Sequence, residues 1–148
     1  MHLVLSRAAF GIALCWVGAC AVRSTSGVAE VYSERHETVL EQRLREKPDD
    51  VNALHILAWI YSTYDRYRYD NAKHVLGLEY AQRAFSIAAD RDIYMYEVLG
   101  AAMYANDNVA EGDRLYDYAI EHAKDEKQRS DLSGNKQKIR SIYSDSQD

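Results

Sequence analysis

The sequence contains little proline and little cysteine. Pro48 is the only proline among its 148 residues, and alanine is frequent, a composition that favours helices over strands. The two cysteines, Cys15 and Cys20, both lie near the N-terminus. A chain of this length can bury about 68% of the surface that its unfolded form exposes, so folding requires neither a disulfide nor a metal.

The common catalytic and metal-binding motifs are also missing. The sequence has no G-x-S-x-G, Walker or G-x-G-x-x-G pattern, and its five histidines stand in no H-E-x-x-H or paired-cysteine arrangement. Segment 131–135 loosely resembles the start of a calcium loop, but Gly134 comes too early and Ile142 stands where an acid should close the loop, which favours a helix cap or kink. We therefore expect no enzyme, no metal and no cofactor.

Basic residues form no cluster, and the formal net charge is -5. This balance argues against nucleic acid as a partner. No segment alternates apolar and polar residues long enough to predict a strand. The unusual abundance is tyrosine, with 12 copies.

The first residues have the layout of a secretory signal peptide. Arg7 is followed by the apolar run Ala8–Val17, which contains no charge. The whole uncharged stretch Ala8–Val22 is 15 residues long. A membrane-spanning helix needs roughly 18 to 20 residues, so a permanent transmembrane anchor is the weaker interpretation.

Val17-Gly18-Ala19-Cys20 closes this run and resembles the bacterial lipobox, with Val17 where leucine is commoner. The resemblance implies that residues 1–19 are removed as a lipoprotein signal peptide and that Cys20 is acylated. The alternative is cleavage by the ordinary signal peptidase, because Ala19-Cys20-Ala21 also fits its small-residue pattern. With Cys20 lipidated and Cys15 removed, no thiol is left to form a disulfide.

Residues 20–27 are small and mostly polar after the cysteine, as expected of a lipidated tether. Ala21 is not an aspartate, which in the lipoprotein resemblance predicts the outer membrane of a Gram-negative cell, facing the periplasm. Residues 28–143 are expected to form one helical domain, and residues 144–148 a polar tail.

Apolar residues recur at helical spacing throughout the expected domain. The segments predicted to be helical are Val28–Glu46, Val51–Thr63, Asn71–Ala88, Ile93–Ala105, Val109–Lys124 and a closing amphipathic helix around Leu132–Tyr143. Pro48 ends the first segment, and Asp49 or Asp50, Asp70 or Asn71, and Asp90 or Asp92 are candidate caps or turn residues.

One pattern occurs twice along these helices. Leu54-x-x-Leu57-Ala58-x-x-Tyr61 matches Tyr96-x-x-Leu99-Gly100-x-x-Met103, 42 residues later, and each copy is followed by a pattern that begins at Gly77 or Gly112. The pairs resemble tetratricopeptide repeats, whose usual period of about 34 residues implies an insertion, between Thr63 and Asp70, in the first copy. The resemblance implies an all-α fold of antiparallel helix pairs stacked as a short α-solenoid. The alternatives are an unrelated helical bundle and a second register, Ala81-x-x-x-Phe85-x-x-Ala88.

In this repeat family the first helix of each pair lines a concave, partner-binding face. By that resemblance the candidate partner-binding residues form two stripes, Asn52, His55, Trp59 and Ser62, then Tyr94, Glu97, Ala101 and Tyr104. Such an aromatic groove with few charges suits an apolar or mixed peptide segment. The alternative is that its aromatic residues are core, with the Tyr/Arg-rich segment Tyr61–Tyr69 as a second candidate surface or a helix extension.

These features predict a protein-protein interaction or assembly module that binds another protein or peptide and is tethered to the bacterial envelope at Cys20. The alternatives are an accessory or regulatory subunit of a cell-envelope enzyme or export system, and a periplasmic helical protein without a lipid.

The lipobox resemblance makes a direct prediction. Replacing Cys20 with serine removes the acceptor thiol, so Cys20→Ser should move the protein from the membrane to the soluble fraction in cell fractionation. A variant that stays with the membrane after a high-salt wash would show that the anchor is something else.

Overall fold

The computed structural model describes residues 28–144, with side chains from His36 onward. The proposed signal peptide, Cys20, the tether and residues 145–148 of the tail lie outside these residues. The helices are α1 (Val28–Glu46), α2 (Val51–Thr63), the short 3-10 helix η1 (Asp65–Tyr67), α3 (Asn71–Ile87), α4 (Ile93–Ala105), α5 (Val109–Glu121) and α6 (Glu126–Ser144). Between residues 28 and 144 there is no strand, so the predicted all-α class is confirmed.

Short polar side chains set the starts of the central helices. Asp50, Asp70, Asp92 and Asn108 are the N-caps of α2, α3, α4 and α5, and each side chain accepts a hydrogen bond from the backbone N–H three residues later. Each bond satisfies one of the N–H groups that a helix leaves unpaired at its start. The short helix η1 lies between α2 and α3, in the segment where the repeat resemblance placed an insertion.

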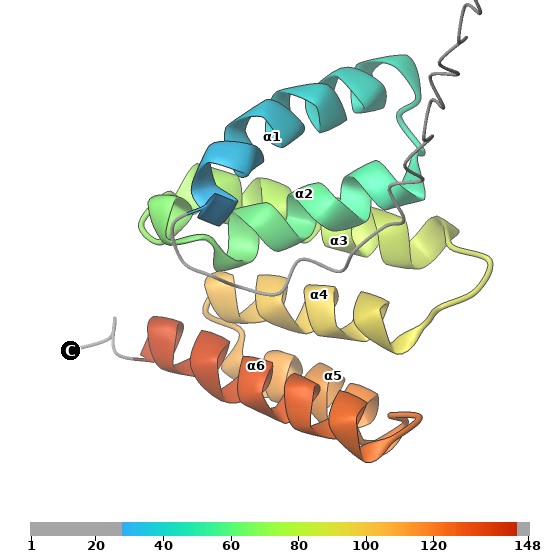
Figure 1. The fold of residues 1–148 in the computed structure, drawn as a ribbon, viewed down its shortest axis with the longest axis vertical. Coiled ribbons are helices and arrows are strands. Elements are labelled where there is room, and N and C mark those ends of the chain that lie inside the picture. Colours follow the sequence, from blue (N-terminus) through green and yellow to red (C-terminus); the bar gives the residue numbers. More distant parts are fainter. Residues whose placement is uncertain (1–27, 145–148) are drawn as a thin grey trace, which may run out of the picture.

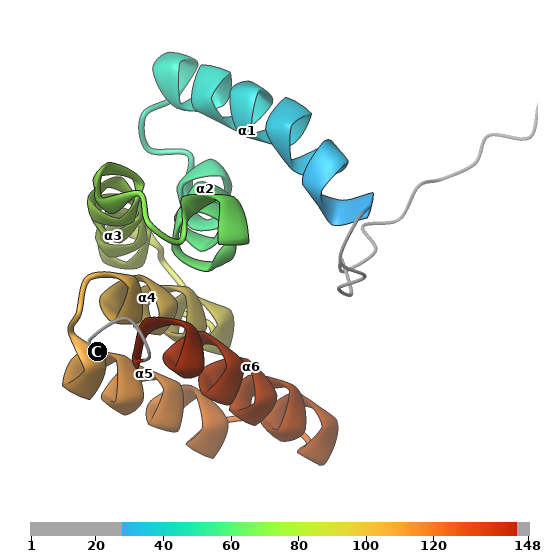
Figure 2. The same ribbon diagram turned by 90° about the vertical axis from the view of Figure 1, so that its left-hand side faces the viewer.

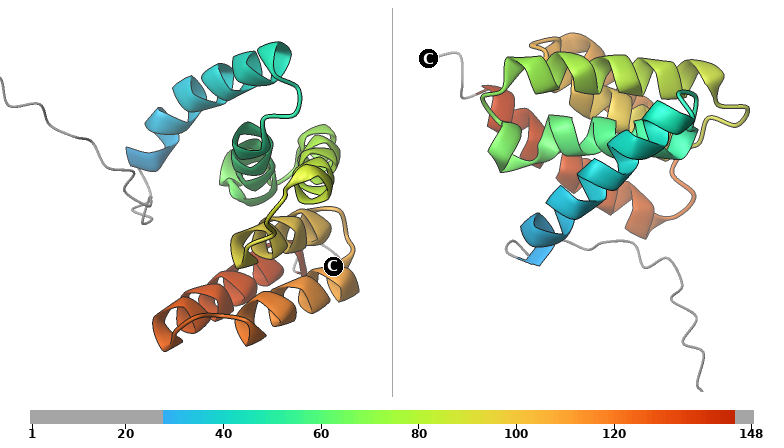
Figure 3. Two further views of the ribbon diagram at one scale, coloured as in Figure 1. Left: turned by 90° about the vertical axis from the view of Figure 1, so that its right-hand side faces the viewer. Right: turned by 90° about the horizontal axis from the view of Figure 1, so that it is seen from above.

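The helices follow one another in alternating directions (Figure 1). The most extensive contacts join α2 to α3 and α4 to α5, and α4 also packs on both α2 and α3. Helix α6 lies against α4 and α5, while α1 crosses α2 obliquely at the opposite end (Figures 2 and 3). The arrangement is compatible with a helical-repeat fold.

The predicted small residues lie where paired helices approach each other. A Cβ on Gly100 would lie 2.8 Å from the Tyr116 ring, and a Cβ on Gly112 would lie 2.7 Å from the Tyr104 ring. The two rings stack with centroids 5.7 Å apart. Gly77 lies in the same way against α2, where a Cβ would be 3.1 Å from Tyr61. Ala81 and Ala84 are buried as well, whereas Phe85 and Ala88 are half-buried.

Helix α6 begins at Glu126, well before the apolar residues that predicted it. Its Leu132, Ile139 and Tyr143 are buried, and Ile139 and Tyr143 pack with residues of α4 and α5. Lys136 pairs with Asp113 and Asp117 of α5, with N–O distances of 3.3 and 2.7 Å. Helix α6 is therefore attached along its whole length to the second helix pair.

No helix within residues 28–144 is both long and apolar enough to cross a membrane.

The close contact between α4 and α5 can be tested with a matched pair of glycine substitutions. Gly112→Ala should lower the free energy of unfolding by about 1 to 3 kcal/mol in urea denaturation, because the added Cβ collides with the Tyr104 ring. Gly134→Ala in α6 meets nothing within 4 Å and should raise it by about 0.5 to 1 kcal/mol, the usual gain from alanine in a helix. Equal effects of the two substitutions would contradict the packing.

Candidate interaction surface

The structure leaves part of the predicted binding stripe accessible. Asn52 and Tyr94 are exposed, and His55 and Trp59 are half-buried. Helical spacing places Ile56, 43% exposed, on the same face of α2. We call Asn52, His55, Ile56, Trp59 and Tyr94 the α2/α4 surface.

A shallow cavity of about 220 Å³ opens within this surface, where α2 and α4 begin. Its lining combines amide, imidazole, carboxylate, phenol and thioether groups, from Asn52, His55, Asp92, Tyr94 and Met95. Gln128 of α6 donates a hydrogen bond to the Tyr94 hydroxyl at 3.1 Å, which orients the ring at one edge of the cavity.

The other residues of the two predicted stripes are buried, so they form no part of an accessible surface in this structure. Ser62, Ala101 and Tyr104 have no exposed surface, and Glu97 is 6% exposed. Asn135 of α6 donates to the Glu97 carboxylate at 2.8 Å.

The burial of Ser62 and Tyr104 has a similar cause. Tyr104 stacks on Tyr116 and donates to Asp113 at 2.7 Å, both in α5. The Ser62 carbonyl accepts a hydrogen bond from Tyr143 of α6 at 2.7 Å. The spacing within α2 and α4 could not reveal these contacts, because the covering helices come later in the chain.

Trp59 connects the accessible surface to the interior. It packs against two buried clusters, one with residues of α2, α3, α4 and α5 and the other with residues of α4, α5 and α6 that include Ile139 and Tyr143. Trp59 is thus half-buried, with part of its side chain accessible, as a groove residue would be, and part packed against the core.

Electrostatics make the cavity nearly neutral on its α2 side. Burial lowers the pKa of His55, and the Asp92 carboxylate opposes that shift to a smaller extent. The imidazole is therefore uncharged near neutral pH and offers one donor and one acceptor nitrogen.

Sequence reasoning missed three residues here. Ile56 is exposed and adds an apolar side chain to the surface. Asp92 was interpreted as a turn residue, and Met95 was not considered. The sequence offered one signal for Ile56, which stands four residues after Asn52 and therefore on the same face of the helix.

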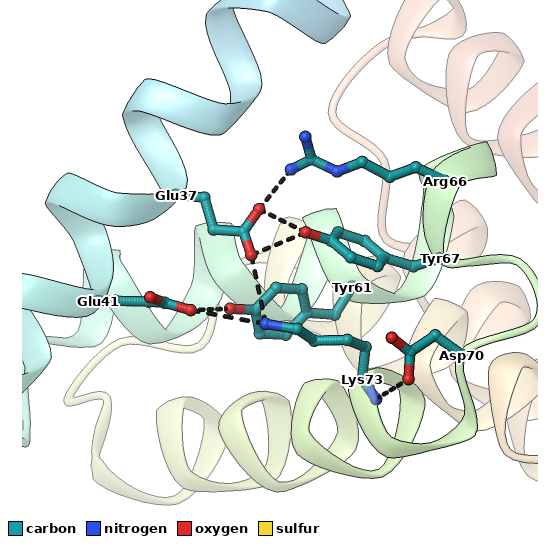
Figure 4. Close-up of polar contacts among 7 residues, drawn as sticks. All are labelled: Glu37, Glu41, Tyr61, Arg66, Tyr67, Asp70 and Lys73. Carbon is teal, nitrogen blue, oxygen red and sulfur yellow. Dashed lines mark hydrogen bonds and ion pairs between the residues drawn. The ribbon is translucent and has the colours of Figure 1, made fainter.

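The second predicted surface, Tyr61–Tyr69, is mostly used inside the domain. Arg66 and Tyr67 bind the carboxylate of Glu37 in α1, as Figure 4 shows. Arg68 donates to the Ile142 carbonyl at 3.3 Å. Tyr69 is 81% exposed, so this residue alone of the segment offers a large free side chain.

Among residues 36–144, no three His, Cys, Asp or Glu side chains come together in a way that could hold a metal ion.

The buried Glu97 carries a testable pH dependence. Burial raises its pKa above the ordinary 4.5, the Asn135 hydrogen bond opposes this shift, and the nearby Asp131 adds to it. The folded state therefore disfavours the ionised form, a cost that is present at pH 7 and disappears as the pH falls through the raised pKa towards 4.5.

Glu97→Gln keeps an acceptor for Asn135 without the charge, so it should raise the free energy of unfolding at pH 7, and this gain should vanish near pH 4 in denaturation curves. Glu121→Gln, at an exposed position of α5, should change stability little at either pH. A Glu97→Gln variant less stable than the parent at pH 7 would contradict the assignment.

Comparison with protein-family models, curated proteins and solved structures finds no match to this chain.

Proposed function

We propose that this protein is an interaction module that binds a segment of another protein on its α2/α4 surface. The module is a short α-solenoid of the tetratricopeptide type, tethered to the bacterial envelope through an acyl chain on Cys20. The proposal makes the protein an assembly or adaptor component and assigns it no catalytic step.

The helix contacts support the repeat part of the proposal. Helices α2 and α4 are the first members of two antiparallel pairs, and each pair has a glycine contact between its helices. Helix α6 packs on α4 and α5 much as α4 packs on α2 and α3, so it takes the place of the first helix of a third pair. Helix α1 correspondingly takes the place of a second helix that precedes the first pair. The solvent side of α6 is polar, as expected of a terminal capping helix.

The observation that carries the binding proposal is the exposure of Tyr94, which lines the cavity, and of Ile56, which follows the lining residue His55 in the sequence. Exposed apolar and aromatic side chains beside a depression are typical of binding sites, because an inserted partner side chain displaces water from both. Asp92 is the only charged group of the cavity lining. A peptide segment with an apolar or aromatic residue flanked by hydrogen-bonding groups fits this surface best.

The α2/α4 surface is testable with matched double substitutions. Ile56→Ala with Tyr94→Ala removes its two most exposed large side chains, whereas Val75→Ala with Tyr69→Ala removes a similar pair elsewhere, 61% and 81% exposed. The first variant should weaken partner binding by roughly 30-fold or more, the loss typical of a hot spot of about 2 kcal/mol, and the second should not.

The measurement is cross-linking and mass spectrometry on membranes that contain the parent or a variant chain, followed by titration with the partner so identified. Both variants should keep the parent's melting temperature to within a few degrees, since the substituted side chains are exposed. A partner that binds both variants as well as it binds the parent would exclude the α2/α4 surface.

A further inference from the structure

Helix α1 meets the rest of the domain along a single stripe. Glu37, Leu40, Glu41 and Leu44 follow one another at steps of three, one and three residues, so they lie on one face of the helix. Glu37 and Leu40 are each 8% exposed, and Leu44 packs against the same apolar cluster as Leu40. On the outer face Val39 is 57% exposed. The stripe combines two leucines for apolar contact with two carboxylates.

The surface beneath this stripe is complementary to it in charge. We call Leu57, Tyr61, Arg66, Tyr67 and Lys73 the acceptor surface. Leu57 belongs to the same apolar cluster as Leu40 of α1. The polar groups of this surface that contact α1, those of Tyr61, Tyr67 and Lys73 among them, are hydrogen-bond donors.

Glu37 receives most of these donors (Figure 4). Tyr67 donates to its two oxygens at 2.6 and 2.8 Å, Lys73 lies at 3.3 Å, and Arg66 forms an ion pair with it. Burial, together with the Glu37 carboxylate, raises the pKa of Tyr67 to about 12, so its hydroxyl remains a donor at neutral pH. Such a buried carboxylate is stable only where these partners surround it.

Glu41 repeats the arrangement one turn later. It accepts a hydrogen bond from Tyr61 at 2.8 Å and lies 3.5 Å from Lys73. The Lys73 ammonium also stands 4.1 Å from the centre of the Tyr61 ring. The acceptor surface therefore selects a helix that carries glutamates four residues apart with leucines beside them.

Outside this stripe, the described side chains of α1, residues 36–46, add no buried residue, and Arg43 forms an ion pair with Asp50 at 2.6 Å. A cavity of about 400 Å³ remains beneath its C-terminal half, lined by Glu41, Leu44, Arg45, Pro48, Leu54, Tyr80 and Arg83. Residues 47–50, which include Pro48, are the whole connection to α2. A terminal helix with so few buried side chains in its described part opens at a lower free-energy cost than the core does.

We propose that α1 undocks and that the acceptor surface then binds α1 of a second copy, so that two copies exchange these helices and form a dimer. The pattern of Glu37, Leu40, Glu41 and Leu44 occurs in no other helix between residues 28 and 144, and a second copy supplies every contact that the first one loses. The exchange uses a face distinct from the α2/α4 surface and does not depend on the proposed function.

The first test uses a fluorescent peptide of residues 28–47 as the probe and the full chain as the receptor. In the parent chain α1 competes with the peptide, so weakening the internal contact should strengthen peptide binding. Glu37→Gln in the chain removes the ion pairs of Glu37 with Arg66 and Lys73 but leaves the acceptor surface unchanged, and should therefore raise the affinity for the peptide at least tenfold. Glu46→Gln, at an exposed position of α1, is the matched control and should not.

Two further variants locate the binding. Adding Lys73→Gln to the Glu37→Gln chain should abolish the gain, and a peptide with Glu37→Gln and Glu41→Gln should bind more weakly than the unmodified one. A Glu37→Gln chain that binds the peptide no better than the parent does would overturn the proposal, provided that circular dichroism shows the chain to be helical.

The second test needs no variant that could unfold. The unmodified chain, mixed with its nitrogen-15-labelled form, should give a dimer of intermediate mass in native mass spectrometry, with a population that rises with concentration and falls on addition of the peptide. Monomers alone at every concentration would overturn the exchange between copies, and peptide binding by such a monomer would assign the acceptor surface to a helix of another protein. A dimer that the peptide does not reduce would place the contact elsewhere.

Discussion

The rings of Tyr104 and Tyr116 fill the space between α4 and α5, and the position of each depends on a glycine of the opposite helix. Gly112 faces the Tyr104 ring and Gly100 faces the Tyr116 ring, and a Cβ at either glycine would come within 2.8 Å of a ring atom. This reciprocal contact brings two helices together without interlocking long side chains, and the dense packing of large rings compensates for the weak helix propensity of glycine. The surfaces that the pair offers to α2, α3 and α6 follow from this geometry.

Helix α6 decides which part of the predicted face remains accessible. This helix packs on α4 and α5, where its Asn135 donates a hydrogen bond to the Glu97 carboxylate. Its Tyr143 donates a hydrogen bond to the carbonyl of Ser62. The accessible part is therefore confined to the beginnings of α2 and α4, where Ile56 and Tyr94 stand beside the cavity. A smaller site with a defined depression is a more specific receptor than a long stripe would be, because fewer partner side chains fit it.

The two ends of the helix stack are held by different forces. Helix α6 is attached by buried apolar residues together with ion pairs such as Lys136 to Asp117, whereas the described part of α1 depends on Leu40, Leu44 and the carboxylates of Glu37 and Glu41. Apolar burial is insensitive to partner identity, but a half-buried carboxylate requires particular donors. The described part of α1 is thus held by the more selective contact of the two.

The sequence by itself determined the six α-helices and the starts of the central ones. Apolar spacing predicted these helices, though not η1 or the start of α6, and residues such as Asp50 and Asp70 set the N-caps, because these are local properties of the chain. Burial of Ser62, Glu97 and Tyr104 was decided by the tertiary structure alone. A residue at one helical spacing can face a solvent-filled groove or a later helix, and only the packing of distant segments distinguishes the two. The pairing of Glu37 with Arg66, Tyr67 and Lys73 likewise joins residues about thirty positions apart, a distance over which spacing carries no information.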